Sequence, residues 1–152
     1  DIAAYVSEMM EDEPDTYFVM GSGSTVGAIM EYLGLENTLL GVDVVRQGKR
    51  EASDVTASQL IALTQGKPCK VVLTVIGGQG HLLGRGNQQL SPEFIRHVGK
   101  QNMIVVATKQ KIRGLHGKPL RLDSGDERLD AQLSGAFTII TGYKDKVLYN
   151  AV

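Results

Sequence analysis

The sequence contains one cysteine, Cys69, no tryptophan and three phenylalanines among its 152 residues. A single cysteine excludes a disulfide framework and a multi-cysteine metal site, and it is typical of a protein of the reducing cytoplasm. Cys69 has no base beside it, so we interpret it as a small core residue.

The longest apolar runs, such as Val71–Ile76, are far too short to cross a bilayer. The first residues carry acids and no basic segment, unlike a signal peptide. We therefore expect a cytoplasmic protein without a membrane partner.

An excess of charge of one sign is also missing. Sixteen Lys and Arg residues oppose 17 Asp and Glu residues, for a net charge of −1, so no bulk attraction to nucleic acid is expected.

The length fits one domain, and 42% hydrophobic with 22% charged residues is typical of a globular chain. No methionine precedes Asp1, which opens directly on a helical pattern. We expect residues 1–152 to be a single α/β domain, the carboxy-terminal domain or a fragment of a longer protein.

Apolar spacing and cap residues predict helices that alternate with strands. The expected strands are Tyr17–Met20, Thr38–Val45, Val71–Ile76, Met103–Ala107 and Pro119–Asp123. The expected helices are Ile2–Met10, Val26–Leu33, Asp54–Thr64, Ser91–Gly99, Thr108–Leu115 and Gly125–Ser134. Phe137–Thr141 and Lys146–Asn150 predict a terminal hairpin. The predicted fold is therefore a layered α/β/α sandwich with a mostly parallel, Rossmann-like sheet and an antiparallel carboxy-terminal hairpin.

What the chain has in quantity is glycine, with 18 residues, many of them after predicted strands. Open parallel sheets bind ligands beyond the carboxyl ends of their strands, so these loops are the candidate sites. The first loop consists of Gly21, Ser22, Gly23, Ser24 and Thr25. The N–H groups of the helix that follows, together with the hydroxyls, can hold a phosphate. A simple strand-to-helix turn capped by Ser or Thr is the alternative.

The second loop runs from Gly77 to Gln89 and is longer than an ordinary strand-to-helix connection. Arg85 can clamp a phosphate or carboxylate, and the amides beside it can bind an amide or a ribose hydroxyl. The predicted binding residues are Gly77, Gly78, Gln79, Gly80, Arg85, Asn87 and Gln88. A solvated surface loop is the alternative. His81, without a second ligand, is more typical of a structural or solvent-facing histidine.

Three further positions carry weaker signals. Thr108–Lys111 places two lysines after a strand, where they can neutralise phosphate, although surface lysines are the ordinary case. Asp43 lies in an apolar segment, and a buried carboxylate is costly unless it is paired. It is the candidate catalytic base, with an outward-facing residue of an edge strand as an equal alternative. Asp123–Asp126 is most simply a helix cap. No metal-binding residues are predicted.

Four segments together resemble the carboxy-terminal domain of ATP-NAD kinase-like proteins, including those named for acetoin catabolism. They are Thr38–Val45, Val75–Gly80, Gly84–Glu93 and Asn102–Thr108. In that family the domain follows an amino-terminal α/β domain. The resemblance implies phosphorylation of NAD by ATP or polyphosphate, with a divalent metal. The Gly-Gly-Asp-Gly-Thr signature of NAD kinases belongs to the amino-terminal domain, and the nearest string here, Gly77–His81, lacks its Asp and Thr. The kinase centre is therefore incomplete in this chain.

A second resemblance, to ribose-5-phosphate isomerases and related sugar-phosphate enzymes, rests on Gly21–Thr25, Gly41–Asp43 and Gly77–Gly80 in the same order. The Asp-Glu pair of those isomerases corresponds to Asp43-Val44, so the acid/base set is incomplete while phosphate binding is retained.

Three function classes follow from these observations. The first is a domain that binds a small phosphorylated metabolite or dinucleotide. Its phosphate would lie at Ser22–Thr25, with Arg85, Asn87 and Gln88 closing over it. The alternatives are a sugar-phosphate isomerase or transferase that uses Asp43, and a structural oligomerisation domain. A homo-oligomer is expected.

Overall fold

The computed structural model describes residues 1–36, 41–84 and 87–152. Its centre is a seven-stranded sheet in the order β3-β2-β1-β4-β5-β6-β7. The strands are β1 (Tyr17–Met20), β2 (Asp43–Arg46), β3 (Lys49–Ala52), β4 (Cys69–Thr74), β5 (Met103–Val106), β6 (Gly135–Gly142) and β7 (Asp145–Ala151). Strands β1, β4, β5 and β6 are parallel, whereas β2, β3 and β7 are antiparallel to their neighbours. The sheet is thus parallel in the middle and antiparallel at both edges.

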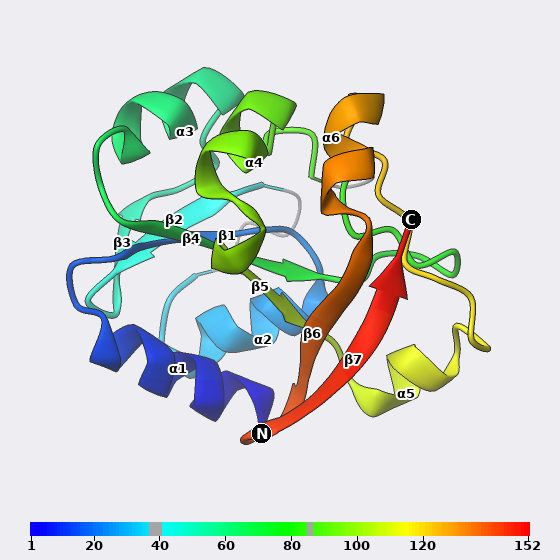
Figure 1. The fold of residues 1–152 in the computed structure, drawn as a ribbon. Helices are drawn as coiled ribbons and strands as arrows, with labels where there is room; N and C mark the ends of the chain where they lie inside the picture. The colour runs from blue at the N-terminus through cyan, green and yellow to red at the C-terminus, as the bar shows by residue number, and fades with distance from the viewer. Residues whose placement is uncertain (37–40, 85–86) are drawn as a thin grey trace.

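Helices cover both faces of the sheet (Figure 1). They are α1 (Ile2–Asp12), α2 (Ser24–Tyr32), α3 (Ala57–Thr64), α4 (Pro92–Val98), α5 (Lys109–Arg113) and α6 (Glu127–Leu133), and a short 3₁₀ turn spans Lys100–Asn102. The buried side chains of α1 and α2 form one apolar cluster with one face of the sheet, and those of α3, α4 and α6 form a second cluster with the other face. The predicted three-layer α/β/α fold is therefore confirmed.

The residues that begin and end helices explain several boundaries. Thr56 accepts a hydrogen bond from Gln59 N, and the Gln59 side chain returns one to Thr56 N, so α3 starts with a reciprocal capping box. Ser91 caps α4, and Pro92 occupies its first position, where no N–H is needed. Gly99, with φ of 82°, ends α4. These ends agree with the sequence prediction to within a few residues.

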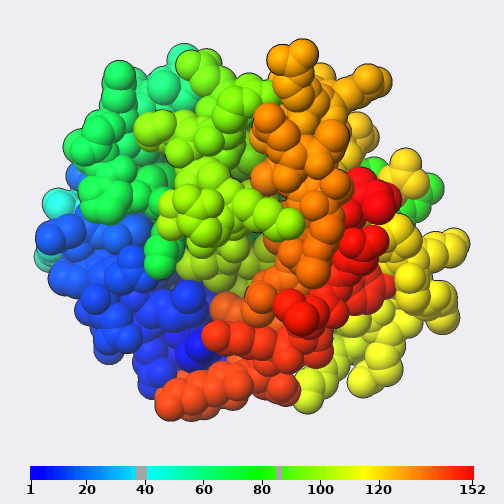
Figure 2. All heavy atoms as spheres, viewed as in Figure 1, coloured from blue at the N-terminus to red at the C-terminus, as the bar shows by residue number. Residues whose placement is uncertain are grey.

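Helix α1, drawn in blue, lies beside the β6–β7 hairpin, drawn in orange and red (Figures 1 and 2). The Tyr143 hydroxyl, in the turn of that hairpin, donates to Glu8 Oε1 at 2.6 Å, and the Tyr5 and Tyr143 rings meet edge to face. These contacts join the first helix to the turn of the last hairpin. No helix in residues 1–36, 41–84 and 87–152 is long and apolar enough to cross a membrane.

Three predictions about the sheet are wrong. Strand β2 runs antiparallel to β1, so the predicted parallel unit does not form there. The polar strand β3 was not predicted. Pro119–Asp123 makes only isolated bridges, to His81 and Ala151, in place of a strand. The predicted strand Thr38–Val45 overlaps β2 only from Asp43 onward, and its residues 38–40 lie outside the described residues.

Candidate functional site

Strands β1 and β4 form the point at which the connections of the sheet change direction. The chain leaves β1 through α2 toward β2 on one side, and it leaves β4 through α4 toward β5 on the other side. Helices α2 and α4 pack on opposite faces of the sheet, as Figure 1 shows. In open α/β sheets ligands bind in the crevice outside the carboxyl ends of such strands. The two predicted glycine-rich loops both lie at this crevice.

The loop Gly21–Thr25 turns directly from β1 into α2. Gly23 is the residue before the helix, with φ of 114° and ψ of 158°, a conformation that only glycine adopts readily. A Cβ at this position would lie closer than 3.0 Å to the Thr74 methyl carbon, so the loop packs directly on the end of β4. No side chain caps the N-terminus of α2. The first N–H groups of this helix therefore point into the crevice, and no side chain of the N-cap residue, Gly23, accepts a hydrogen bond from them.

Ser22 and Asn87 link the two loops. Asn87 Oδ1 accepts hydrogen bonds from Ser22 N at 2.9 Å and from Ser22 Oγ at 3.1 Å. Both residues are buried, with Asn87 only 1% exposed. In the structure, Ser22 and Asn87 therefore hold the loops together across the crevice, whereas Ser24 is exposed and Thr25 half-buried.

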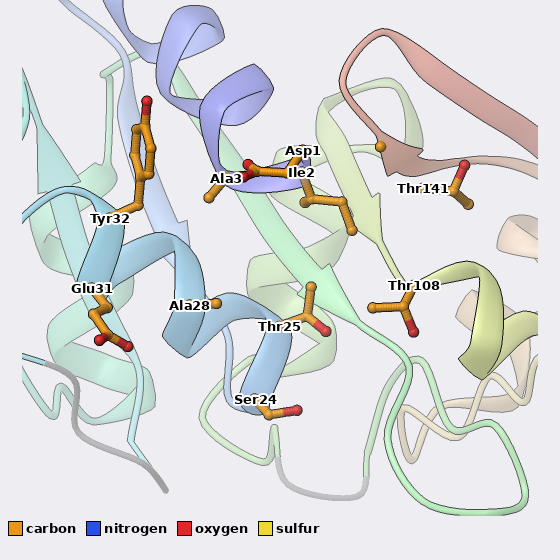
Figure 3. A pocket seen from close by; sticks show the side chains of 11 residues that line it. Asp1, Ile2, Ala3, Ser24, Thr25, Ala28, Glu31, Tyr32, Thr108 and Thr141 are labelled. Carbon is orange, nitrogen blue, oxygen red and sulfur yellow. The ribbon is translucent and has the colours of Figure 1, made fainter.

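A cavity of about 610 Å³ opens beside the N-terminus of α2 (Figure 3). In Figure 3 the side chains of Thr25, from α2, and Thr108, from the turn after β5, lie on either side of a shared space, with Ser24 at its lower edge. Glu31 and Tyr32, at the other end of α2, also line it. The remaining lining residues are Asp1, Ile2, Ala3, Ala28, Thr141 and Gly142. Hydroxyls are thus grouped near the helix N-terminus and carboxylates lie at Glu31 and Asp1.

The segment after β4 is more ordered than a solvated loop. Ile76 and His81 exchange backbone hydrogen bonds of 2.8 and 2.9 Å, which closes Gly77–Gly80 into a tight turn. Gly77 and Gly78 line a second cavity of about 360 Å³ with Thr108 and Lys111. The Lys111 ammonium donates to Gly77 O at 2.9 Å, so a cation lies at the carboxyl end of β4. Gln79 is exposed and Gly80 is buried beneath the turn.

The other residues predicted for the second loop do not line either of these two cavities in the described part of the chain. Arg85 lies outside the described residues. Asn87 and Gln88 line a third cavity, of about 550 Å³, together with His81 and Asp123. Sequence reasoning missed Glu31, Tyr32 and Thr141, because no local motif marks residues that reach a cavity from the far end of a helix or strand.

Asp43 is buried, with 2% of its surface exposed, so the alternative of an outward-facing residue is wrong. It begins β2 opposite Met20, the last residue of β1, and therefore lies at the same edge of the sheet as the loops. Its Oδ1 accepts a hydrogen bond from Asp54 N at 2.9 Å. The three cavities above do not include Asp43 among their described lining residues.

Two lysines follow β5. Lys109 pairs with Asp145 at 2.7 Å on the surface, and Lys111 lines the second cavity. Within the described residues, no group of three or more His, Cys, Asp and Glu side chains could hold a metal ion. We assign no step to the divalent metal that the resemblance implies. Cys69 is half-buried, and burial raises the pKa of its thiol to about 12, which disfavours the reactive thiolate.

Comparison with known proteins gives one match. The sequence model of the ATP-NAD kinase C-terminal domain matches residues 13–151, which include both loops and every strand. No curated protein and no solved structure gives a significant match.

Proposed function

The chain belongs to the ATP-NAD kinase C-terminal domain family, and on this premise we propose that it binds the phosphate groups of a nucleotide, ATP or NAD, in the crevice outside β1 and β4. The observation that carries the proposal is the N-terminus of α2. It has no side-chain cap and opens at the point where the connections of the sheet change direction. Helix N-termini favour anions through their free N–H groups and through the helix dipole.

The surroundings of this helix end support an oxyanion as the ligand. The Ser24, Thr25 and Thr108 hydroxyls border the same cavity and can donate hydrogen bonds to phosphate oxygens. Lys111 lies in the adjoining cavity, which shares Thr108 with the first. A local cation such as Lys111 and several N–H groups are enough for phosphate recognition, so a near-neutral chain can bind phosphate.

The opposite end of the cavity suits the uncharged part of a nucleotide. Tyr32 is 57% exposed, and its ring offers an apolar face on which a base can stack. It lies seven residues after Thr25 on α2, or about 10 Å along the helix axis. Glu31 lies beside it and disfavours phosphate there. We therefore place the phosphates at Ser24 and Thr25 and the base toward Tyr32.

We further propose that this binding serves the phosphorylation of NAD to NADP, a transferase reaction whose signature in this family belongs to an amino-terminal domain. We also propose that the protein acts in the cytoplasm, which rests on its single cysteine, and that it forms a homo-oligomer. Isomerase chemistry on Asp43 is not proposed, because its described hydrogen bond is to the backbone of Asp54 and it lines none of the three cavities in the described part of the chain.

Thr25→Glu tests the phosphate site. The carboxylate would stand in the first turn of α2, where the helix dipole stabilises it by about 0.3–1 kcal/mol, so the fold should be retained. A bound phosphate would meet a like charge, which costs about 1 kcal/mol at ~4 Å even in water. Calorimetric titration with ADP and NAD should therefore show binding weakened about fivefold or more.

Ser58→Glu is the matched control. Ser58 is exposed and occupies the same second position of a helix, α3, whose end is already capped by Thr56. It should leave ADP and NAD binding unchanged. Equal binding by wild type and Thr25→Glu would remove the proposal. Tyr32→Ala should weaken ADP binding and leave pyrophosphate binding unaffected, which tests the orientation of the nucleotide separately.

A further inference from the structure

A third cavity, of about 550 Å³, lies on the face of the sheet covered by α4 and α6. It is lined by His81, Gly84, Asn87, Gln88, Leu90, Pro92, Asp123, Ser124 and Gly125. None of these residues lines the cavity beside α2. The volume is in the range of cavities that bind small molecules.

Two residues that line this cavity each carry a buried polar atom without a hydrogen-bond partner within residues 1–36, 41–84 and 87–152. The two atoms are Asn87 Nδ2 and His81 Nδ1, and the two side chains are 1% and 9% exposed. The orientation of the Asn87 amide is fixed, because the atom next to Ser22 N, a donor, must be the oxygen. Nδ2 is therefore a donor without a partner among the described residues. Buried polar groups are nearly always paired, so an unpaired one at a cavity points to a missing ligand atom.

The cavity is built on a fixed frame. A Cβ on Gly84, whose φ is 90°, would lie closer than 3.0 Å to Asp123 O, so the loop backbone rests directly on the segment before α6. Ser124 Oγ donates to Asp130 Oδ1 at 2.6 Å, and Asp126 caps α6 through Leu129 N. These contacts hold both walls in place before any ligand binds.

The chemistry of the walls selects hydroxyl groups. Asn87 Nδ2 is a donor and requires an acceptor. The exposed Asp123 carboxylate, in its ionised form, accepts hydrogen bonds and donates none. A hydroxyl satisfies both kinds of group, and His81 Nδ1 can serve either role. The Asp123 carboxylate among the lining residues repels an anion. A neutral ligand with hydroxyls on adjacent carbons therefore fits better than a phosphate.

We infer that this cavity binds the vicinal diol of a sugar, such as the ribosyl group of a nucleoside, through Asn87, His81 and Asp123. This inference does not rest on the proposed phosphate site, since the two cavities have no lining residue in common.

The test is a nuclear magnetic resonance titration of the full chain with D-ribose and with adenosine at millimolar concentrations. The inference predicts saturable shifts of the His81, Asn87 and Ser124 amide signals with both compounds. The matched ligand control, 2′,3′-dideoxyadenosine, lacks the diol and should not shift them.

Asn87→Asp is the matched variant, because it keeps the oxygen that accepts from Ser22 N and removes only the Nδ2 donor. It should weaken the binding of adenosine about tenfold. Gln132→Glu, the same change at an exposed position of α6, should leave binding unchanged. The inference is overturned if neither ribose nor adenosine shifts these signals, if the dideoxy compound shifts them equally, or if a folded Asn87→Asp variant binds like wild type.

Discussion

Gly23→Ala is the substitution whose cost can be worked out most fully from the structure. Gly23 has φ of 114° and ψ of 158°, a region essentially restricted to glycine, so alanine there costs about 1–3 kcal/mol in backbone strain. The new methyl would also lie closer than 3.0 Å to Thr74 Cγ2. Thr74 is buried in β4, and such overpacking costs a further ~1–3 kcal/mol. The expected loss in the free energy of unfolding is about 2–6 kcal/mol, a large part of the stability of a domain of this size.

Urea denaturation followed by circular dichroism measures this loss, and two further variants separate its two causes. Thr74→Ser removes only the methyl that meets the new Cβ, so the double variant should recover the steric part, although the lost methyl itself costs about 0.5–1.5 kcal/mol. Gly66→Ala is the control for backbone conformation alone. Gly66 has φ of 73° with no atom within 4 Å of a Cβ, so it should cost only about 1–2 kcal/mol.

Two results would refute the reasoning. One is a Gly23→Ala protein within about 0.5 kcal/mol of wild type, since surface substitutions typically fall in that range. The other is a double variant whose loss equals the sum of the two single losses, because residues in contact should show coupling.

Three further predictions follow from the described contacts. Cys69 should react with Ellman's reagent at pH 8 only after unfolding. Burial raises the pKa of its thiol from 9.0 to about 12, so stability should fall as the pH rises through that interval, where only the unfolded chain loses the proton. The hydrogen bond from Arg96 and the Leu129 N–H hold the pKa of Asp126 below its usual value, and Arg96→Ala should raise it in a carboxyl titration by nuclear magnetic resonance. The stability from Asp126 is present above the usual carboxyl pKa and should be lost as the pH falls through the lowered one. Gly84→Ala should destabilise the protein more than Gly66→Ala in urea, because its Cβ would meet the backbone of Asp123; equal losses would contradict this.

The parts of the fold that were predicted correctly are those whose signals are local. The range Tyr17–Met20 was predicted without error, because an apolar run followed by glycine marks a buried strand and its end. Ser91 and Pro92 marked the start of α4 through a side-chain cap and a missing N–H. The hairpin of β6 and β7 followed from two apolar segments around a short turn.

The errors arise where the signal is long-range or absent. Hydrophobic periodicity carries no information on strand direction, so the antiparallel pairing of β1 with β2 could not be read from it. Strand β3 is polar and exposed at an edge of the sheet, and only its turn gives a local signal. Gln47 and Gly48, with φ of 54° and 70°, have the positive φ values of a two-residue hairpin turn.

Pro119–Asp123 shows why alternation alone is insufficient. Leu120 and Leu122 are both buried, as the alternating pattern predicts. Their segment, however, lies between the loop after β4 and the end of β7, with Arg121 N bonded to Gly80 O and Leu120 N to Asn150 O. The apolar residues are therefore placed as in a strand, while the backbone partners come from two separate segments.

For the candidate site, the sequence located the loops but not their contacts. Gly21–Thr25 and Gly77–Gln88 were found because glycines follow strands, yet the bond from Ser22 N to Asn87 Oδ1 joins residues 65 positions apart. Asn87 was predicted to close over a ligand. In the structure its oxygen accepts a hydrogen bond from Ser22 N, and the residue lines the third cavity. Only the tertiary fold decides which polar atoms of a loop bind protein and which stay unpaired.

The most direct test of the phosphate site is the response of backbone amides to ADP. A titration of the wild-type chain, followed by ¹H–¹⁵N correlation spectra, should give the largest saturable shifts at Gly23, Ser24 and Thr25, the N-terminus of α2, with inorganic pyrophosphate reproducing them. Shifts absent from these amides, or concentrated at other residues with both ligands, would contradict the proposal that this helix end binds the phosphates of a nucleotide.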